Sequence, residues 1–225
     1  MTESSAVSPR ASAPIRPSDT KYELWSYQTL RRVVGVLGVS MPIAVAIWGR
    51  VLPAPHRFLP TLSDYYGFRT RDVFVGVLFT IAWFLFTYRG YDRRDRIAGK
   101  LACIFALGVA FFPNNGPGLE PAVHYLSAAA LFLVLAYFSL CLFTETDRNG
   151  NPTSKKLVRN RVYRRCGVFM VACIVLIGLC KLAGTPRLIS AANPVFWLET
   201  LALWAFGFSW FVKGETLWKD SPRST

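Results

Sequence analysis

The sequence is poor in acidic residues and in histidine. Its 225 residues include 13 Asp and Glu against 26 Lys and Arg, and the only histidines are His56 and His124. Two histidines cannot form a three-histidine zinc site. The chain also has no Walker-type phosphate loop, no GxSxG motif and no HExxH motif, which excludes the enzyme classes that depend on them. We therefore expect no metal or other cofactor, with a mixed site of His56, His124 and a carboxylate as the alternative.

Cysteine gives no indication of a disulfide framework. The five cysteines lie inside or at the edge of apolar stretches, and no CxxC motif occurs. Cys166, Cys173 and Cys180 recur every seven residues, so they share roughly one face of a helix. We interpret them as small packing residues on a helix contact, with a redox or metal-binding role as the alternative.

A polar stretch long enough for a separate soluble domain is also missing. Of the residues, 52% are hydrophobic, and the mean hydropathy is +0.32. The apolar residues form six blocks that approach the roughly 20 helical residues needed to cross a membrane. These predicted spans are residues 33–52, 72–88, 97–112, 122–143, 166–182 and 194–212. We predict an all-α fold, an integral membrane bundle of about six transmembrane helices.

The ends of the chain have a different composition from this predicted membrane domain, which covers residues 25–215. Residues 1–24 are rich in Ser, Pro and Ala up to about residue 18 and lack the apolar core of a signal peptide, so we predict a disordered cytoplasmic tail. Residues 216–225 are predicted to form a short cytoplasmic tail.

Most of the positive charge falls on one side of the predicted membrane. With the amino terminus inside, only six of the 26 bases lie outside, namely Arg50, Arg57, Arg69, Arg71, Lys181 and Arg187. Cytoplasmic loops carry an excess of Lys and Arg, so both termini are predicted to be cytoplasmic. We attribute the net charge of +13 to this topology and to membrane lipids as partners. We expect no nucleic-acid binding, because the spans are not accompanied by a basic and aromatic surface.

Three ionisable residues are predicted to share one depth near the outer face. Asp72 begins the second span, His124 lies near the start of the fourth, and Glu199 lies near the start of the sixth. Glu199 is roughly 8 Å into its helix at 1.5 Å per residue, so we expect it to face the bundle interior with a partner. The candidate partners are His124, Lys181, Arg69 and Arg71. Asp72, His124 and Glu199 are candidates for a ligand-binding or catalytic role, and a role in helix packing or capping is the alternative.

The segment before the second span could contribute to the same site. Tyr65 and Tyr66 offer hydroxyl groups, and Arg69 and Arg71 are suited to bind phosphate or carboxylate. We predict that this loop covers a pocket, although tyrosines at this depth are also typical of the aromatic belt of membrane proteins.

A second candidate contact lies on the cytoplasmic side, before the fifth span. Arg159, Arg161, Arg164 and Arg165 occur within seven residues. They are predicted to contact anionic lipid, and simple anchoring by positive charge is the alternative.

Several short motifs, in this order, resemble a group of uncharacterised bacterial six-helix membrane proteins. The motifs are Ser63-Asp-Tyr-Tyr66, Arg71-Asp-Val-Phe-Val-Gly76, Tyr88-Arg-Gly-Tyr-Asp92, His124-Tyr-Leu-Ser-Ala128, Arg159-Asn-Arg-Val-Tyr163 and Phe196-Trp-Leu-Glu199 through Lys213-Gly-Glu215. More distantly, the chain is similar to the superfamily of the autophagy modulator DRAM and the GPI-anchor-remodelling proteins. The resemblance implies a multi-pass protein of the bacterial inner membrane. Membrane hydrolases of the alkaline ceramidase type have a related plan, but this chain lacks the histidines of their metal site.

The sequence leaves three functions open. The leading one is binding of a lipid or small polar ligand in an outer-leaflet pocket with Asp72, His124 and Glu199 as its walls. The second is hydrolysis of lipid amide or ester bonds with Glu199 or Asp72 as the base, and the third is proton-coupled transport through Glu199. Whether the protein is an enzyme, and its oligomeric state, are left open by these residues.

Overall fold

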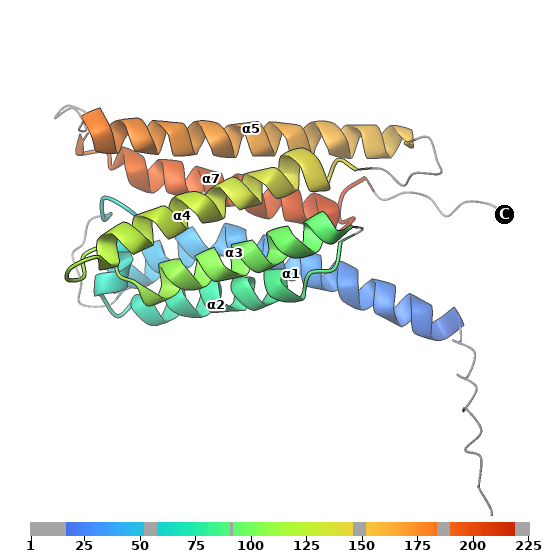
Figure 1. Ribbon diagram of the computed structural model, residues 1–225, viewed down its shortest axis with the longest axis horizontal. Coiled ribbons are helices and arrows are strands. Elements are labelled where there is room, and N and C mark those ends of the chain that lie inside the picture. Colours follow the sequence, from blue (N-terminus) through green and yellow to red (C-terminus); the bar gives the residue numbers. More distant parts are fainter. Residues whose placement is uncertain (1–16, 52–57, 91, 146–151, 184–189, 219–225) are drawn as a thin grey trace, which may run out of the picture.

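The computed structural model describes residues 17–51, 58–90, 92–145, 152–183 and 190–218, and all regular structure in these ranges is helical (Figure 1). The α-helices described are α1 (Pro17–Val51), α2 (Arg71–Thr87), α3 (Arg93–Phe111), α4 (Glu120–Tyr137), α5 (Ser154–Ala183) and α7 (Pro194–Lys213). A short 3-10 helix, η1 (Ser63–Gly67), precedes α2, and a π-helical turn, η2 (Phe138–Leu142), continues α4. The predicted all-α class is confirmed.

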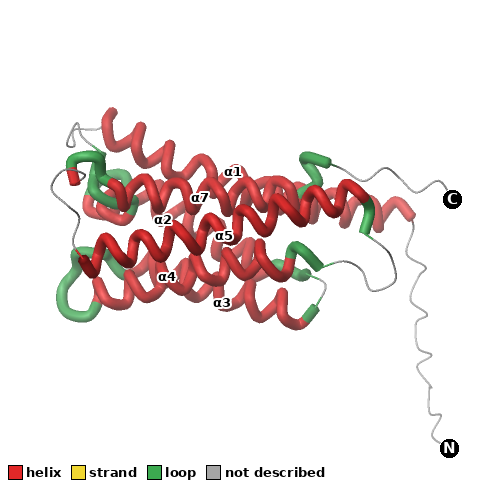
Figure 2. Tube along the Cα trace, turned by 90° about the horizontal axis from the view of Figure 1, so that it is seen from above, coloured by secondary structure: helices red, strands yellow, loops and turns green. Residues whose placement is uncertain are grey.

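The helices lie along the long axis of the molecule as a bundle in which successive helices run in opposite directions (Figures 1 and 2). Helices α2, α3 and α4 pack on one another in chain order, while α7 packs between α1 and α5. The first and last described helices are therefore neighbours. Arg31 and Arg32 of α1 donate hydrogen bonds to the backbone oxygens of Lys213 and Gly214, which end α7. These bonds satisfy carbonyl groups that a helix end leaves without partners.

Glycine allows the backbones of α1 and α7 to approach closely. A Cβ atom added to Gly207 would lie 2.7 Å from the backbone oxygen of Gly35, and one added to Gly35 would lie 2.9 Å from that of Gly207. Both distances are shorter than a normal van der Waals contact. The two helices can therefore pack at this distance only because neither position carries a side chain.

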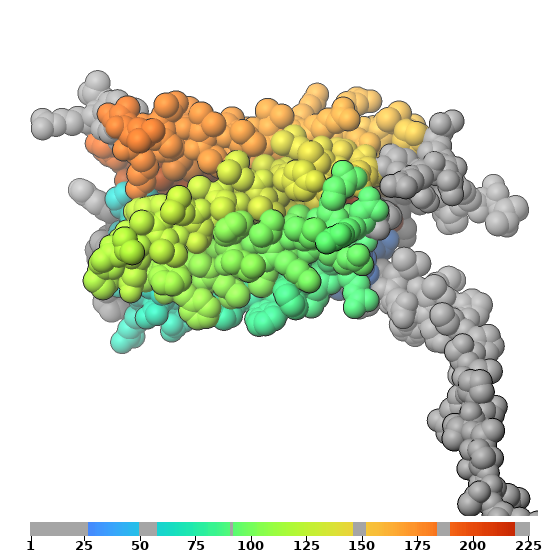
Figure 3. All heavy atoms as spheres, in the orientation of Figure 1, coloured from blue at the N-terminus to red at the C-terminus, as the bar shows by residue number. Residues whose placement is uncertain are grey.

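Four helical segments are long and apolar enough to cross a membrane, namely Tyr27–Gly49, Glu120–Leu142, Ser154–Ala183 and Pro194–Lys213. Large apolar side chains such as Ile47, Leu133 and Val168 are exposed on the outside of the bundle, and Figure 3 shows the face formed by α3, α4 and α5. An apolar outer surface is expected where helices contact lipid. The structure thus indicates a membrane protein.

Helices α2 and α3 were predicted as spans but do not belong to this set. Helix α2 has 17 residues, and at 1.5 Å per residue it is about 25 Å long, against a hydrocarbon core of about 30 Å. Helix α3 begins with Arg93, Arg94, Asp95 and Arg96, so its apolar part is shorter than its 19 residues.

Two helices begin earlier than predicted. Helix α1 starts at Pro17, so residues 17–24, which we assigned to a disordered tail, are helical. Helix α5 starts at Ser154 and has 30 residues, so its first turns precede the predicted span at residue 166. Hydropathy marks only the part of a helix that matches a membrane, whereas Lys, Arg, Glu and Leu continue the helix because their helix propensities are high.

The two ends of the bundle differ in character. Helices α2, α4 and α7 begin at one end, on the left in Figure 1, and residues 58–70 fold across that end. We call residues 58–70 the capping segment and this end the capped end. At the opposite end, the basic end, α1 begins, α7 ends, and α3 and α5 begin with clusters of Lys and Arg.

Candidate functional site

The capping segment is held to the start of α7 by three hydrogen bonds. The backbone N–H of Phe196 donates to the carbonyl of Pro60 at 3.0 Å, and the side-chain amide of Asn193 donates to the carbonyl of Phe58 at 2.7 Å. Glu199 accepts a hydrogen bond from the backbone N–H of Leu62 at 2.6 Å. Asn193 occupies the N-cap position of α7 but makes no side-chain capping bond, because its side chain binds the capping segment instead.

Polar side chains also tie the capping segment to the connection between α3 and α4. The amide of Asn114 donates to a carboxylate oxygen of Asp64 at 2.6 Å, and the other oxygen of Asp64 accepts from the backbone N–H of Thr61 at 3.0 Å. The hydroxyl of Tyr66 lies 3.4 Å from the carbonyl oxygen of Phe111. The segment is therefore fixed from two sides of the bundle.

His124 of α4 contacts the capping segment through Ser63. Its side chain is fully buried, with Nδ1 2.6 Å from the carbonyl oxygen of Phe112 and Nε2 2.8 Å from Oγ of Ser63. A carbonyl oxygen only accepts hydrogen bonds, so we assign the ring proton to Nδ1. In the neutral imidazole, Nε2 is then an acceptor, and the hydroxyl of Ser63 donates to it. This is the orientation in which a histidine can take a proton from a serine.

Glu199 pairs with a backbone amide and not with the cations that we predicted as partners. Among the described residues, its carboxylate takes part in no ion pair with Arg69, Arg71 or Lys181. The partner was missed because Leu62 offers a free backbone N–H at the start of a short helix, and no side-chain pattern reveals such a donor. Glu199 also lines the cavity described next, together with Leu203 of the same helix.

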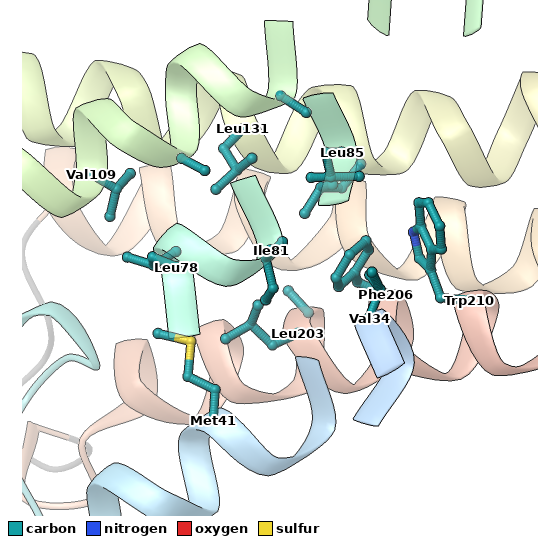
Figure 4. Close-up of a cluster of buried hydrophobic side chains, with 14 of the residues drawn as sticks. Val34, Met41, Leu78, Ile81, Leu85, Val109, Leu131, Leu203, Phe206 and Trp210 are labelled. Atoms are coloured by element: carbon teal, nitrogen blue, oxygen red, sulfur yellow. The ribbon is translucent and has the colours of Figure 1, made fainter. Parts of the chain in front are cut away.

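A small cavity of about 50 Å³ lies directly beneath the capping segment. It is lined by Met41, Leu62, Ser63, Phe74, Leu78, Val109, Ala128, Leu131, Phe132, Glu199 and Leu203. Figure 4 shows Leu78, Val109 and Leu131 directed toward the same interior space, with Met41 and Leu203 below them. Only Ser63 and Glu199 among these residues carry polar side chains. The cavity is therefore an apolar space with one polar side, and it can accept a narrow chemical group.

The tyrosines and one arginine of the predicted loop belong to the capping segment and its border. Tyr65 and Tyr66 are buried, and the hydroxyl of Tyr65 accepts from the backbone N–H of Leu59 at 3.4 Å. Arg71 lies over the ring of Tyr66 at 4.7 Å and donates to its hydroxyl at 3.2 Å. These contacts stabilise the segment itself, and neither tyrosine lines the cavity.

Asp72 and Arg69 lie apart from this cluster. Both side chains are exposed, and neither forms a hydrogen bond or an ion pair within the part of the chain that the structure describes. The structure thus brings His124 and Glu199 to the capping segment but leaves Asp72 on the surface. Asp72 occupies the first turn of α2, where a carboxylate is favoured by the helix dipole.

Three further polar residues of the site were not among the predicted site residues, namely Ser63, Asp64 and Asn114. Ser63 and Asp64 stand in the first motif of the resemblance and at the start of the segment that was predicted to cover a pocket. Asn114 lies in the Pro-rich and Gly-rich turn after α3, where a turn role is the ordinary interpretation.

The four predicted lipid-contacting arginines do not share one environment. Arg159 is buried and donates to the backbone oxygen of Trp218 at 2.7 Å, whereas Arg161, Arg164 and Arg165 are exposed. Arg159 therefore holds the segment after α7, and only the other three remain available to lipid headgroups.

The sequence left metal-binding and redox roles open for the cysteines and histidines, and the described residues show where most of these side chains lie. No group of three or more His, Cys, Asp or Glu side chains there could hold a metal ion, and His56 lies outside the described residues. All five cysteines are free; Cys173 is buried, and Cys166 and Cys180 are half-buried.

In comparisons with protein families, curated proteins and solved structures, nothing matches this chain. The resemblance to bacterial six-helix proteins therefore stays a prediction, and the function is argued from the geometry of the capped end.

Proposed function

We propose that this chain is a multi-pass protein of a bacterial inner membrane, with six helices across the bilayer and the basic end in the cytoplasm. The apolar outer surface of the bundle supports the membrane location. Helices α2 and α3 are included because they run antiparallel beside α1 and α4 within the same bundle. The Lys and Arg residues at the start of α3 and of α5 support the orientation, because cytoplasmic segments carry such an excess. The capped end then faces the periplasm.

The function that we propose is binding of a lipid or another amphiphile at the capped end. The observation that carries this proposal is the cavity beneath the capping segment, where nine apolar residues and two polar ones meet. Binding sites for small amphiphiles combine an apolar lining with a few placed polar groups in the same way.

The size and polarity of the cavity limit the ligand. A volume of about 50 Å³ accepts only a narrow group, such as a short part of an acyl chain. The hydroxyl of Ser63 and the carboxylate of Glu199 lie on one side, where they would face a carbonyl, hydroxyl or amide of the ligand. A complete lipid would leave its headgroup outside the cavity, near the capping segment.

Lipid hydrolysis, the second function predicted from the sequence, gains one specific supporting observation. This observation is the hydrogen bond between Ser63 and His124, which was not predicted from the sequence. The two residues replace Asp72 as the candidates for a catalytic role. Glu199 is less suited to act as the base, because its carboxylate already accepts a hydrogen bond from Leu62.

Photochemical crosslinking tests the binding proposal. The protein is reconstituted into bilayers that contain phosphatidylethanolamine with a diazirine in its acyl chain, and crosslinked peptides are mapped by mass spectrometry. We expect crosslinks at cavity residues such as Leu78 and Leu131. In Ala128→Leu, the larger side chain fills the cavity, so these crosslinks should fall several-fold.

Ala129→Leu is the matched control, because Ala129 is the next residue of α4 and is exposed. It should leave the crosslinks at Leu78 and Leu131 unchanged while adding the same atoms to the protein. Equal labelling in wild type, Ala128→Leu and Ala129→Leu would contradict binding in the cavity.

A further inference from the structure

We propose that Ser63 is a nucleophile and His124 its general base, and that the protein transfers the acyl group of a membrane ester. This inference rests on the proposed function, because the ester would be bound with part of its acyl chain in the cavity. It assigns a reaction to a pair of residues that lies 61 positions apart in the chain and meets only in the folded protein.

The geometry of the pair is that required for proton transfer. Oγ of Ser63 and Nε2 of His124 are 2.8 Å apart, within the range for a serine and its base. The carbonyl of Phe112, 2.6 Å from Nδ1, holds the ring in the tautomer whose Nε2 is free to accept a proton. In serine hydrolases a carboxylate has this orienting role, and here a backbone carbonyl performs it.

The surroundings of Ser63 supply two further requirements. Ser63 lines the apolar cavity, so an acyl chain placed there would bring its carbonyl carbon close to the serine hydroxyl. Within the described part of the chain, the backbone N–H of Ser63 forms no hydrogen bond, so it is free to donate to the oxyanion that forms during attack.

The reaction proceeds in two balanced steps. In the first, Oγ of Ser63 bonds to the carbonyl carbon of the ester, its proton passes to Nε2 of His124, and the ester C–O bond breaks. The leaving alcohol takes that proton from His124, and an acyl-serine remains. In the second, water or a second alcohol attacks the acyl-serine, gives its proton to His124, and Ser63 leaves with the proton returned to its oxygen. No oxidant, reductant or metal is consumed in these steps.

The hydrogen bond between Ser63 and His124 can be compared with one that has only a structural role. The hydroxyls of Ser139 and Ser209 form another buried side-chain hydrogen bond, also at 2.8 Å, and it joins η2 to α7. That pair contains no base, so it can hold helices together but cannot activate a nucleophile. Ser209 is therefore the internal comparison for Ser63.

Labelling with an alkyl fluorophosphonate tests the proposal, because this probe bonds covalently to serines that a base activates. The full-length protein in bilayers is treated with the probe, and the modified peptide is identified by mass spectrometry. We expect modification of Ser63 and none of Ser139 or Ser209. His124→Gln keeps a donor and an acceptor at this position but cannot accept a proton, so the labelling rate should fall about 100-fold or more.

Ser209→Ala should label like wild type, and Ser63→Ala should lose the modification. Acylation by p-nitrophenyl acetate, followed by intact mass, is measured in parallel, because this smaller ester reaches confined sites more easily. The proposal is overturned if neither reagent modifies Ser63, or if His124→Gln is modified as fast as wild type. Retained diazirine crosslinks at Leu78 and Leu131 in that case would show that amphiphile binding stands while acyl transfer fails.

Discussion

Glu199 stabilises the capped end through a short hydrogen bond. Its carboxylate accepts the backbone N–H of Leu62 at 2.6 Å, and Leu62 is buried in the core. A backbone N–H that loses its acceptor in an apolar surrounding costs about 1–3 kcal/mol. Because Leu62 directly precedes Ser63, this contact also sets the position of the serine in the capping segment.

The first prediction compares two replacements of Glu199. Glu199→Gln keeps an oxygen that can accept the Leu62 N–H, so we expect its free energy of unfolding to fall by less than about 1 kcal/mol. Glu199→Leu leaves the N–H without an acceptor and should cost about 1–3 kcal/mol. Thermal unfolding in one detergent measures both. Equal losses in the two variants would show that the negative charge, and not the hydrogen bond, is what the site requires.

At the scale of helices, close packing between α1 and α7 determines how the two halves of the bundle join. Gly35 and Gly207 face each other across this contact, and Arg31 and Arg32 bind the carbonyls at the end of α7. Helix α7 also supplies Asn193, Phe196 and Glu199 to the capping segment. A change in the distance between α1 and α7 would therefore also change the position of the residues that α7 supplies to the site.

The second prediction concerns this contact. Gly207→Ala adds a Cβ atom that would lie 2.7 Å from the backbone oxygen of Gly35, so the helices must separate. We expect a loss of about 1–3 kcal/mol in the free energy of unfolding, as for other overpacked interiors. The measurement is thermal unfolding together with the crosslinking assay for the cavity.

Gly178→Ala is the matched control in α5. A Cβ atom at Gly178 meets no atom within 4 Å, so the substitution should leave stability unchanged or raise it by up to about 1 kcal/mol through helix propensity. If Gly207→Ala proved as stable as Gly178→Ala, the close approach of α1 and α7 would be wrong.

For the molecule as a whole, the two ends of the bundle differ in their polar residues. The capped end is closed by hydrogen bonds among polar groups, and the basic end carries the clusters of Lys and Arg. The proposed orientation follows from that asymmetry, since positive residues remain on the cytoplasmic side. It places the cavity and the Ser63–His124 pair in the outer leaflet.

The third prediction tests this orientation with reporter fusions. Alkaline phosphatase fused after Asn115 or Arg187 should be active, because both points follow helices that end at the capped end. Fusions after Arg94 or Asn151 should be inactive and should instead give fluorescence with green fluorescent protein. A cytoplasmic signal at Asn115 would reverse the orientation and move the cavity to the inner leaflet.

The sequence by itself determined the helical class, the positions of the apolar segments and the uneven distribution of charge. Each of these is a local property, because hydropathy, helix propensity and charge can be summed along a continuous stretch of chain. It also identified His124 and Glu199 as unusual residues near the starts of α4 and α7. The inward position of Glu199 was predicted, whereas the full burial of His124 was not.

Only the tertiary structure decided what these residues contact. Glu199 meets a backbone amide 137 positions away, and His124 meets Ser63 and a backbone carbonyl. Asp72, predicted beside them, lies on the surface in the first turn of α2. A helix sequence gives the depth of a residue, but the rotation of each helix and the path of residues 58–70 are set by packing between distant segments, which no local pattern records.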